Sequence, residues 1–590
     1  MLLCFWALCP SLRVFEIPIL RTPEMYDYHP PLRDMRFVIE HVLRAPTQWA
    51  QIPDFAEVDM STAIEVLQQA GRFTREVLLP LNALGDRQGC RLEGGRVCTP
   101  NGFPAAWRAY VDAGWPALSC DPRWGGQGLP RLLDAALGEM VNATNHAWNM
   151  YAGILHGAYE TVKAHGSDDL KARYLSRLAS GEWLSAMALT EPQSGSDLGG
   201  VRTRAEPQAD GSLAVTGSKV FISGGDHDLT DNIVHLVLCR LPEAPPGTKG
   251  LSLALVPKVL PDGSRNSMTA DGIEHKMGIH GSAPCAMRYE GATGWLLGEP
   301  HRGLAAMFVM MNAARLAVAV QGLGHLDMAT QNARRYAAER QQFRAPIAQQ
   351  PAMRRTLLNG QAMAEGLRVV VYRAAMRLDE AERHPDAARR AAAAAEASIL
   401  TPVLKAFGSQ QGFQGASDAL QVFGGYGYVA ETGVEQTLRD VRIAMIYEGT
   451  NEIQAIDLLQ RKLLGREAEA FAALLSELRK EAEGAGDDGR PLATQIDAAQ
   501  HAMAMVRDRA ARDAEAPLRV ADDFLAGVAY LLMAWAWTAS LRAAERCTAE
   551  DLAPAERATV ARHGLDWLLP QSAVHWQRVN AALPLGRVGA

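Results

Sequence analysis

Residues 442–454 read Arg442-Ile443-Ala444-Met445-Ile446-Tyr447-Glu448-Gly449-Thr450-Asn451-Glu452-Ile453-Gln454, and they place one carboxylate among apolar neighbours. Glu448 follows a run of apolar side chains, and a glycine and a helix-starting threonine come directly after it. An apolar setting raises the pKa of a carboxyl group, and a general base works best when its pKa lies near the operating pH. The segment therefore predicts that Glu448 is a general base.

The composition is that of a soluble globular protein with several domains. The chain has 590 residues, of which 48% are hydrophobic and 21% charged, so disorder is excluded. A chain of this length predicts about three or four domains. The net charge of −7 argues against a nucleic-acid partner. The 8 cysteines are scattered without a C-x-x-C pair or a His cluster, which predicts reduced thiols, no metal and a cytoplasmic location.

The first ten residues, Met1 to Pro10, are apolar but do not have the layout of a signal peptide. They lack a basic segment and a small-x-small cleavage site, and they are too short to span a bilayer. Our interpretation is a start assigned too far upstream, with Met25 as the natural initiator. Mass spectrometry of the protein expressed from its own gene would contradict this if it found an intact Met1.

Helical and β-type segments follow one another in blocks along the chain. From about residue 61 to 181 the apolar residues recur at helical spacing, and long amphipathic segments return after Gly303. Between about 187 and 298, short β-type runs separated by Pro and Gly turns indicate a compact, barrel-like β domain. The predicted fold class is mainly α with an inserted β domain. The expected domains are an N-terminal extension 1–60, an N-terminal helical domain 61–186, a middle β domain 187–300, a C-terminal helical bundle 301–465 and an additional helical domain 466–590.

The same periodicity predicts individual elements. Bundle helices are expected over Met307–Ala338, Met353–Arg383, Arg389–Phe407 and Ala416–Phe423. Strands are expected over Leu213–Thr216, Lys219–Ser223, Ile233–Leu238 and Leu251–Val256. The glycine-rich segment Asp121–Pro130 is either a connection between helices or a loop that approaches a ligand. The apolar run Val528–Trp537 is short for a membrane span, so a buried core or interface helix is favoured over a membrane helix.

Three more segments carry side chains suited to binding a nucleotide cofactor. Met187–Asp197 is a small polar loop that offers hydroxyls and backbone N–H groups, although alone it is an ordinary Ser/Gly turn. Lys219–Ser223 places an aromatic ring and a hydroxyl on one strand, and alone it is an ordinary strand. Tyr336–Phe343 ends a helix with Arg340, whose guanidinium suits a pyrophosphate but is more often a solvated charge.

Together with the segment around Glu448 and the helix–β–helix order, these segments resemble the acyl-CoA dehydrogenase family. The resemblance covers nearly the whole chain and extends to the additional C-terminal helical domain, which short members of the family lack. Two segments, Pro31–Phe37 and Gly224–Asp228, look like the large subfamily that contains 3-methylmercaptopropionyl-CoA dehydrogenases. The subfamily resemblance indicates the reaction better than it indicates the acyl chain of the substrate. The identity of that acyl chain stays open.

The resemblance implies FAD-dependent α,β-dehydrogenation of an acyl-CoA thioester to trans-2-enoyl-CoA, and with it a role in fatty acid metabolism. Glu448 would remove the α proton while the β hydride passes to flavin N5, and the electrons would go on to an electron-transfer flavoprotein. Some relatives place the base on the first bundle helix, one position before an arginine. That position is Ala314 here, so Glu448 has no rival. The nearby acids Glu431, Glu435 and Asp440 stand in polar surroundings, which predicts solvated side chains.

The resemblance also implies the binding residues and an oligomer. The implied flavin contacts are Met187, Leu189, Thr190, Ser196, Phe221, Ser223, Arg340, Gln342, Phe343, Gln421, Gly424, Gly425, Thr450 and Glu452. The implied substrate contacts are Ser196, Asn312, Arg315, Tyr447 and Gly449. Residues 421–427 resemble the loop that usually contacts the adenosine of a neighbouring subunit's flavin, which implies a homodimer or a dimer of dimers. Arg344 departs from the family pattern, which has a glycine there.

Two other functions compete with dehydrogenation. An acyl-CoA oxidase has a similar fold and passes its electrons to oxygen. A non-enzymatic flavoprotein relative would bind DNA or serve as an assembly scaffold. The acidic net charge argues against DNA binding, and the intact segment around Glu448 argues against a dead enzyme.

Overall fold

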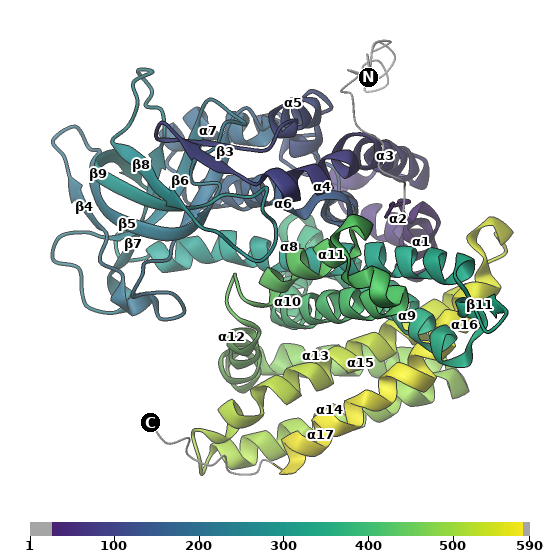
Figure 1. The fold of residues 1–590 in the computed structure, drawn as a ribbon. Helices are drawn as coiled ribbons and strands as arrows, with labels where there is room; N and C mark the ends of the chain where they lie inside the picture. Colours follow the sequence, from purple (N-terminus) through teal and green to yellow (C-terminus); the bar gives the residue numbers. More distant parts are fainter. Residues whose placement is uncertain (1–25, 582–590) are drawn as a thin grey trace, which may run out of the picture.

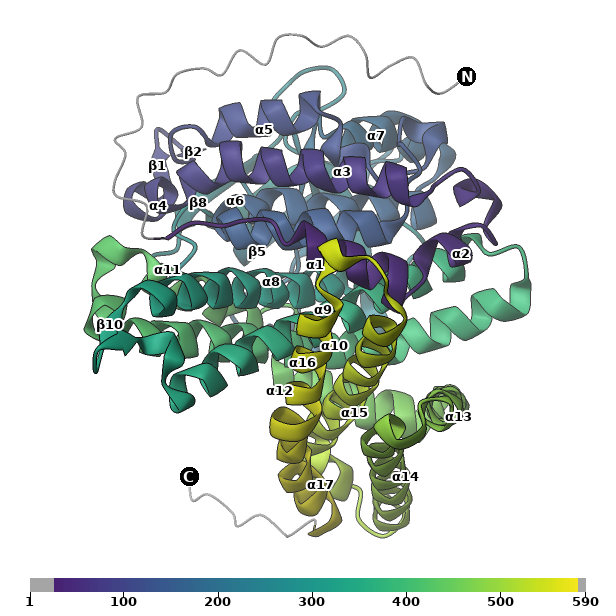
Figure 2. The same ribbon diagram turned by 90° about the vertical axis from the view of Figure 1, so that its right-hand side faces the viewer.

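The structure is a computed structural model that describes residues 26–581. The predictions for Met1–Pro10 and Met25 therefore lie outside the described residues. Figure 1 shows the β domain on one side of a helical body, with the last helices as a further layer below it. Figure 2 shows these last helices running across the long helices of the bundle.

The helices before the β domain form one layer. They are α1 Leu32–Phe37, η1 Val38–Val42, α2 Ala45–Trp49, η2 Pro53–Phe55, α3 Met60–Phe73, η3 Thr74–Leu78, α4 Leu79–Gln88, α5 Phe103–Asp112, η4 Trp115–Ala117, η5 Pro122–Trp124, α6 Arg131–His165 and α7 Asp168–Ser180, with a small hairpin of β1 Arg91–Glu93 and β2 Arg96–Cys98. The first described residues pack into the main core, since Tyr28, Trp49 and Phe55 are buried there. Asp34 of α1 also accepts a hydrogen bond from Arg557, far along the chain.

The glycine-rich segment Asp121–Pro130 connects α5 to α6 through η5, as the first of its two interpretations expected. A Cβ at Gly126 would lie 2.0 Å from the carbonyl oxygen of Cys120, so only glycine lets this connection fold back on itself.

Seven strands form the middle domain, and most of them close into a barrel. They are β3 Leu184–Ala188, β4 Arg204–Pro207, β5 Leu213–Ser223, β6 Ile233–Arg240, β7 Leu251–Pro257, β8 Met268–Ile273 and β9 Pro284–Leu296. The order is β3-β6-β4-β5-β9-β7, and β7 pairs again with β6, which closes the ring. We predicted two strands where β5 is continuous. Two register shifts let β5 bend around the barrel without breaking.

The bundle is built on three long helices. Its elements are α8 Gly303–Glu339, β10 Gln341–Gln342, β11 Ala345–Pro346, α9 Pro351–Arg383, α10 Ala387–Phe423, η9 Gly424–Tyr428, η10 Ala430–Thr432, α11 Val434–Val441, η11 Arg442–Met445, α12 Asn451–Ile456 and η12 Asp457–Arg466. The prediction of two helices in the region of α10 is wrong. Glycines in this region bring α10 against α8, because a Cβ at Gly322 would lie 2.1 Å from the carbonyl oxygen of Gly408.

The last layer contains α13 Ala468–Gly484, α14 Arg490–Ala510, α15 Ala516–Arg546, α16 Pro554–His563, η15 Gly564–Leu568 and α17 Ser572–Ala581. Two described helices, α8 and α15, are long and apolar enough to cross a membrane by length and composition. In α15, however, 89% of the most apolar window is buried inside the protein. The prediction of a buried helix at Val528–Trp537 is confirmed, because every residue of this run is buried.

Candidate active site

Glu448 lies in a tight loop between η11 and α12, and its backbone is held in an unusual conformation. Its φ is +58°, in the left-handed region that non-glycine residues rarely adopt, and Gly449 follows at +83°. The side chain of Gln454 donates to the carbonyl oxygens of Glu448 and Gly449, at 3.0 and 3.3 Å. Thr450 accepts a hydrogen bond from the backbone of Ile453 at 3.4 Å, which confirms the predicted helix cap. The loop therefore holds a strained residue in one position.

The side chain of Glu448 is half-buried and has one buried oxygen that is unsatisfied. Its Oε2 is buried without a hydrogen-bond partner. Burial raises the pKa of Glu448 to about 7, although the positive charges of Arg315 and Lys405 pull in the opposite direction. A carboxylate with a pKa near neutrality and a free oxygen can accept a proton from a bound molecule.

Arg315 of α8 faces this loop from the bundle. The side chain is buried, and its Nη1 lies 3.3 Å from a carboxylate oxygen of Asp457 and 3.4 Å from the side-chain oxygen of Asn312. Asn312 itself is exposed, one turn earlier on the same helix. Two of the residues implied as substrate contacts thus meet beside the carboxylate of Glu448.

The hydroxyl of Tyr447 is fixed by a chain of buried polar groups. It donates to the side-chain oxygen of Gln321 and lies 3.2 Å from Nε2 of His146, whose Nδ1 lies 2.9 Å from Nε2 of His325. Burial lowers the pKa of His146 to about 3, and that of His325 well below its usual range, so both rings are neutral. The ring next to Glu448 is therefore held by polar but uncharged partners.

The other acids near the base differ from one another in their surroundings. Glu431 is exposed, as expected, and Glu435 binds Arg439 with an oxygen–nitrogen distance of 2.9 Å. The prediction of a solvated Asp440 is wrong. Asp440 is buried and accepts the backbone N–H of Ile279, and burial raises its pKa to about 6. This partner lies 161 residues earlier in the chain, which the local sequence could not indicate.

The implied flavin residues of the β domain form a first group at one end of β3 and β5. The backbone N–H of Val220 donates to the carbonyl oxygen of Thr190 at 2.9 Å, which joins the polar loop to β5. The loop is anchored by Glu191, whose Oε1 lies 2.8 Å from Nζ of the fully buried Lys219. Burial raises the pKa of Glu191, but the charge and hydrogen bonds of Lys219 prevail and lower it to about 2.

Exposed and half-buried side chains in this group leave room for a ligand. Phe221 has φ +59° and a 63% exposed side chain, which is unusual for a large aromatic residue on a barrel strand. Met187, Leu189, Thr190 and Ser223 are half-buried, and Ser196 is exposed. In the base segment Thr450 is half-buried and Glu452 is exposed.

Helix α6 connects this group to the base. A Cβ at Gly224, next to Ser223, would lie 3.3 Å from the ring of Tyr151. The preceding residue, Met150, has its sulfur 3.6 Å from the hydroxyl of Tyr447. The end of β5 and the base segment therefore pack on neighbouring residues of one helix.

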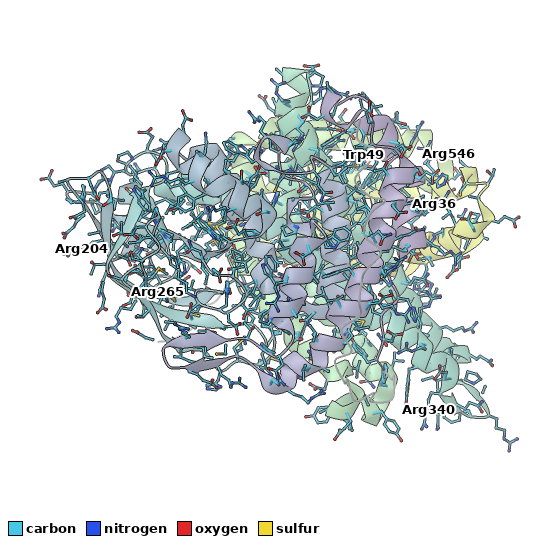
Figure 3. All side chains as sticks on the ribbon, turned by 90° about the horizontal axis from the view of Figure 1, so that it is seen from above. Arg36, Trp49, Arg204, Arg265, Arg340 and Arg546 are labelled. Carbon is cyan, nitrogen blue, oxygen red and sulfur yellow. The ribbon has the colours of Figure 1, made fainter. Side chains whose placement is uncertain are left out.

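The remaining implied flavin residues form a second group at the far end of α8. Its members are Arg340, Gln342, Phe343, Gln421, Gly424 and Gly425, and all are exposed. The guanidinium of Arg340 lies 6.0 Å from the ring centre of Tyr426, which brings the two segments together. Figure 3 shows Arg340 at the opposite extremity of the molecule from Arg204 of the β domain.

The β10–β11 turn keeps its shape despite the missing glycine. Phe343 and Arg344 both have positive φ, at +52° and +65°, as the two central residues of a tight hairpin turn require. Arg344 thus adopts a left-handed conformation that glycine would adopt without strain, at a cost of about 1–2 kcal/mol.

The second group lies at the opposite end of the long part of α8 from Arg315, which faces the base. Twenty-five positions of continuous helix separate Arg315 from Arg340, which is roughly 40 Å along the axis of α8. The first group fits the ring end of a flavin, since the exposed face of Phe221 and the hydroxyls of Thr190 and Ser223 offer stacking and hydrogen bonding. The second group is exposed and carries the guanidinium of Arg340, which suits a pyrophosphate.

The sequence interpretation missed several residues that hold the base. Lys405 of α10 is fully buried, and its Nζ donates to the side-chain oxygen of Asn451 at 3.1 Å. Gln454 and Asp457 complete the surroundings of the loop. A lysine within the apolar run Ile399–Phe407 was the one visible signal. Within residues 26–581 no group of three or more His, Cys, Asp or Glu side chains could hold a metal ion.

Comparisons with known proteins match most of the chain to one family. Residues 61–182 match the acyl-CoA dehydrogenase N-terminal domain, residues 186–292 the middle domain, and residues 301–463 the C-terminal domain. A 3-methylmercaptopropionyl-CoA dehydrogenase of Ruegeria pomeroyi is 42% identical over 497 residues, which cover 81% of this chain and 84% of the relative. The broad-specificity linear acyl-CoA dehydrogenase FadE5 of Mycobacterium tuberculosis is 34% identical, over 79% of this chain and 80% of the relative.

Solved structures share the fold over nearly the full length. Caenorhabditis elegans ACDH-11 in complex with C11-CoA superposes with a TM-score of 0.75 at 19% identity, covering 96% of this chain and 93% of that chain. An acyl-CoA dehydrogenase from Bacillus anthracis complexed with FAD has a TM-score of 0.75 at 23% identity and covers 91% of each chain. The additional C-terminal helices are therefore part of a fold found in other proteins.

Proposed function

Because this chain belongs to the acyl-CoA dehydrogenase family and is an FAD-dependent oxidoreductase, we propose that Glu448 is the base that removes the α proton of an acyl-CoA thioester. The observation that supports this role is the carboxyl group with a pKa of about 7 and a buried Oε2 without a hydrogen-bond partner. A thioester carbonyl acidifies the C–H bond beside it, so a carboxylate of this kind is a base strong enough for the step. The product is a trans-2-enoyl-CoA.

The chain's own residues position the reacting groups. Arg315 and Lys405 favour the ionised form of Glu448. The side chain of Tyr447 lies next to Glu448 in the sequence and is held in place by its contact to His146. The backbone N–H of the base residue is available to stabilise the negative charge that develops on the thioester oxygen. When bound, FAD supplies the hydride acceptor. Thr190, Phe221 and Ser223 would hold its ring end, and exclusion of water from this region strengthens every charge interaction in it.

The experiment that tests the reaction is anaerobic titration of the purified flavoprotein with a panel of acyl-CoAs. The panel includes linear chains from short to long, branched and aromatic acyl groups, and a thioether acyl-CoA, because the relatives named above act on linear and thioether substrates. We expect loss of the oxidised flavin absorbance with at least one member, and formation of the matching 2-enoyl-CoA. No bleaching with any member would contradict the proposed reaction.

We also propose that an electron-transfer flavoprotein, and not oxygen, accepts the electrons. The support is the family, whose known members include dehydrogenases that match about four fifths of this chain. The reduced protein is mixed with an electron-transfer flavoprotein or with air-saturated buffer, and the return of flavin absorbance is followed. Fast return in air with release of hydrogen peroxide would identify an oxidase instead.

The proposed assembly is a homodimer or a dimer of dimers. The support is the resemblance of residues 421–427 to a loop that contacts a neighbouring subunit's flavin, together with the distance of roughly 40 Å along α8 between Arg315 beside the base and Arg340. Sedimentation of the flavin-loaded protein tests this, and a monomer with full flavin content would contradict it. The six described cysteines are free thiols, which suits the reducing conditions of the proposed cytoplasmic location.

Flavin reduction by a good substrate is expected to depend on pH with a single rising limb near pH 7. Glu448 is active only when ionised, and burial raises its pKa to about 7. Below that pH the rate falls about tenfold for each unit, because the ionised fraction falls by that factor. Stopped-flow measurements between pH 5.5 and 9 check this at saturating substrate, and a flat profile over that range would contradict it.

A further inference from the structure

Lys405 is a buried cation without a carboxylate partner at ion-pair distance. Its side chain is fully buried in the middle of α10, and its Nζ donates to the side-chain oxygen of Asn451 at 3.1 Å. Within the described part of the chain, no Asp or Glu oxygen lies within 4.0 Å of its Nζ. Buried charges are usually paired, because removing an ammonium from water costs several kcal/mol. A lysine in this position therefore calls for a functional explanation.

Asn451 links Lys405 to the base. It is the first residue of α12, three positions after Glu448, and its side chain also donates to the carbonyl oxygen of Ala406 at 3.2 Å. The hydroxyl of Ser409 donates to the same Asn451 oxygen at 3.2 Å. The loop that carries the base is thus attached to one turn of α10, and Lys405 lies at the centre of that attachment.

The charges around Lys405 and Glu448 come from every neighbouring element. They belong to α8, η11, the base loop, α12 and η12: Arg315, Arg442, Glu448, Glu452, Asp457 and Lys462. Asp457 lies 3.3 Å from Arg315 and 3.8 Å from both Arg461 and Lys462, so it already pairs with three cations. Glu452 is exposed to solvent. Among these acids, Glu448 is therefore the one whose negative charge can compensate the positive charge of Lys405.

We propose that Lys405 is a positioning residue for the base, whose ammonium keeps the carboxylate of Glu448 ionised while its bond to Asn451 holds the loop. This proposal rests on the proposed role of Glu448. An opposite charge nearby favours the ionised form of an acid, and the effect is large where protein replaces water. Burial lowers the pKa of Lys405 to about 7, while the charge of Glu448 raises it. The two groups therefore favour each other's charged form.

Two substitutions of Lys405 distinguish the effect of its charge from the effect of its hydrogen bond. Lys405→Gln keeps a donor for Asn451 and removes the charge, whereas Lys405→Met removes both. In both variants we expect the rising limb of the pH profile of flavin reduction to move to higher pH by about one unit. Because of this shift, the reaction at pH 6 should be roughly tenfold slower. The rates should approach that of the unaltered protein at high pH, with KM little changed. Lys405→Arg, which retains the charge, should keep the limb near its original pH.

Lys462→Met is the matched control. Lys462 is a second buried lysine close by, but it faces Asp457 and not the base. We expect this variant to leave the limb in place. A limb that does not move in Lys405→Gln would overturn the proposal, and so would an equal loss of rate at every pH, which indicates a structural role only.

Infrared titration gives a reading that does not depend on turnover. The infrared band of the protonated Glu448 carboxyl is identified as the one missing from the Glu448→Gln variant. The pH midpoint at which this band disappears is then measured in the unaltered protein and in the Lys405→Gln variant. We expect a higher midpoint in the lysine variant, and an unchanged midpoint would overturn the proposal. If Glu448→Gln instead keeps normal bleaching, the proposed base itself fails, which is a different result from failure of the lysine.

Discussion

Glu448→Gln is expected to bind FAD normally and to lose acyl-CoA-dependent bleaching by about 10²- to 10⁴-fold, the usual contribution of a positioned general base. Glutamine has the same shape as the carboxyl group but cannot accept the α proton. The Glu448 backbone, with φ at +58°, is held by Gln454 and the cap at Thr450, so the loop should keep its conformation. Stopped-flow absorbance with the best substrate of the panel measures the change.

The control for this substitution is Glu431→Gln. Glu431 is exposed and lies in the segment before the base, so its replacement should change the rate less than twofold. Bleaching close to normal in Glu448→Gln would show that another group removes the proton. A loss of flavin from that variant would instead show that the loop no longer folds correctly.

Trp537→Ala is expected to destabilise the additional helical layer by about 3–5 kcal/mol, the usual cost of truncating a fully buried aromatic residue. The Trp537 side chain is 1% exposed, and its Nε1 donates to the carbonyl oxygen of Ala362 at 2.8 Å. It fits between two glycines, since a Cβ at Gly366 would lie 2.7 Å from its Nε1 and one at Gly564 would lie 2.4 Å from its Cε2. Alanine would leave a cavity between α9, α15 and η15.

The matched control is Trp567→Ala in the same layer. Trp567 is 57% exposed, so its loss should change stability by less than about 1 kcal/mol. Urea unfolding followed by circular dichroism compares both variants with the unaltered protein. Equal midpoints for the two variants would contradict the view that Trp537 joins the last helices to the bundle.

The local features of the base segment could be predicted from sequence because they depend on near neighbours. The apolar run before Glu448 and the cap at Thr450 act within a few residues, and the structure has the cap as expected. The helix–β–helix order was likewise visible from periodicity. The roles of the flavin and substrate residues stay predictions that the mutants and titrations above can test.

Features that depend on distant contacts could not be predicted. Asp440 looked solvated because its sequence neighbours are polar, yet it is buried against Ile279. Lys405 looked like one more helix residue, because its neighbour Asn451 lies 46 positions away. The single helix α10 was predicted as two, because local periodicity and helix propensity say nothing about a second helix packed against it.

The glycine contact between α8 and α10 also determines how far apart the charges of the active site lie. A Cβ at Gly412 would come within 2.7 Å of the Cα of Gly322, so here the two helix backbones touch with no side chain between them. Arg315 stands on α8, and Lys405 stands on α10. Even one added methyl group at this contact would push the helices apart and weaken the electric field at the carboxylate of Glu448. These glycines would therefore act on the proposed base only through the spacing of the two helices.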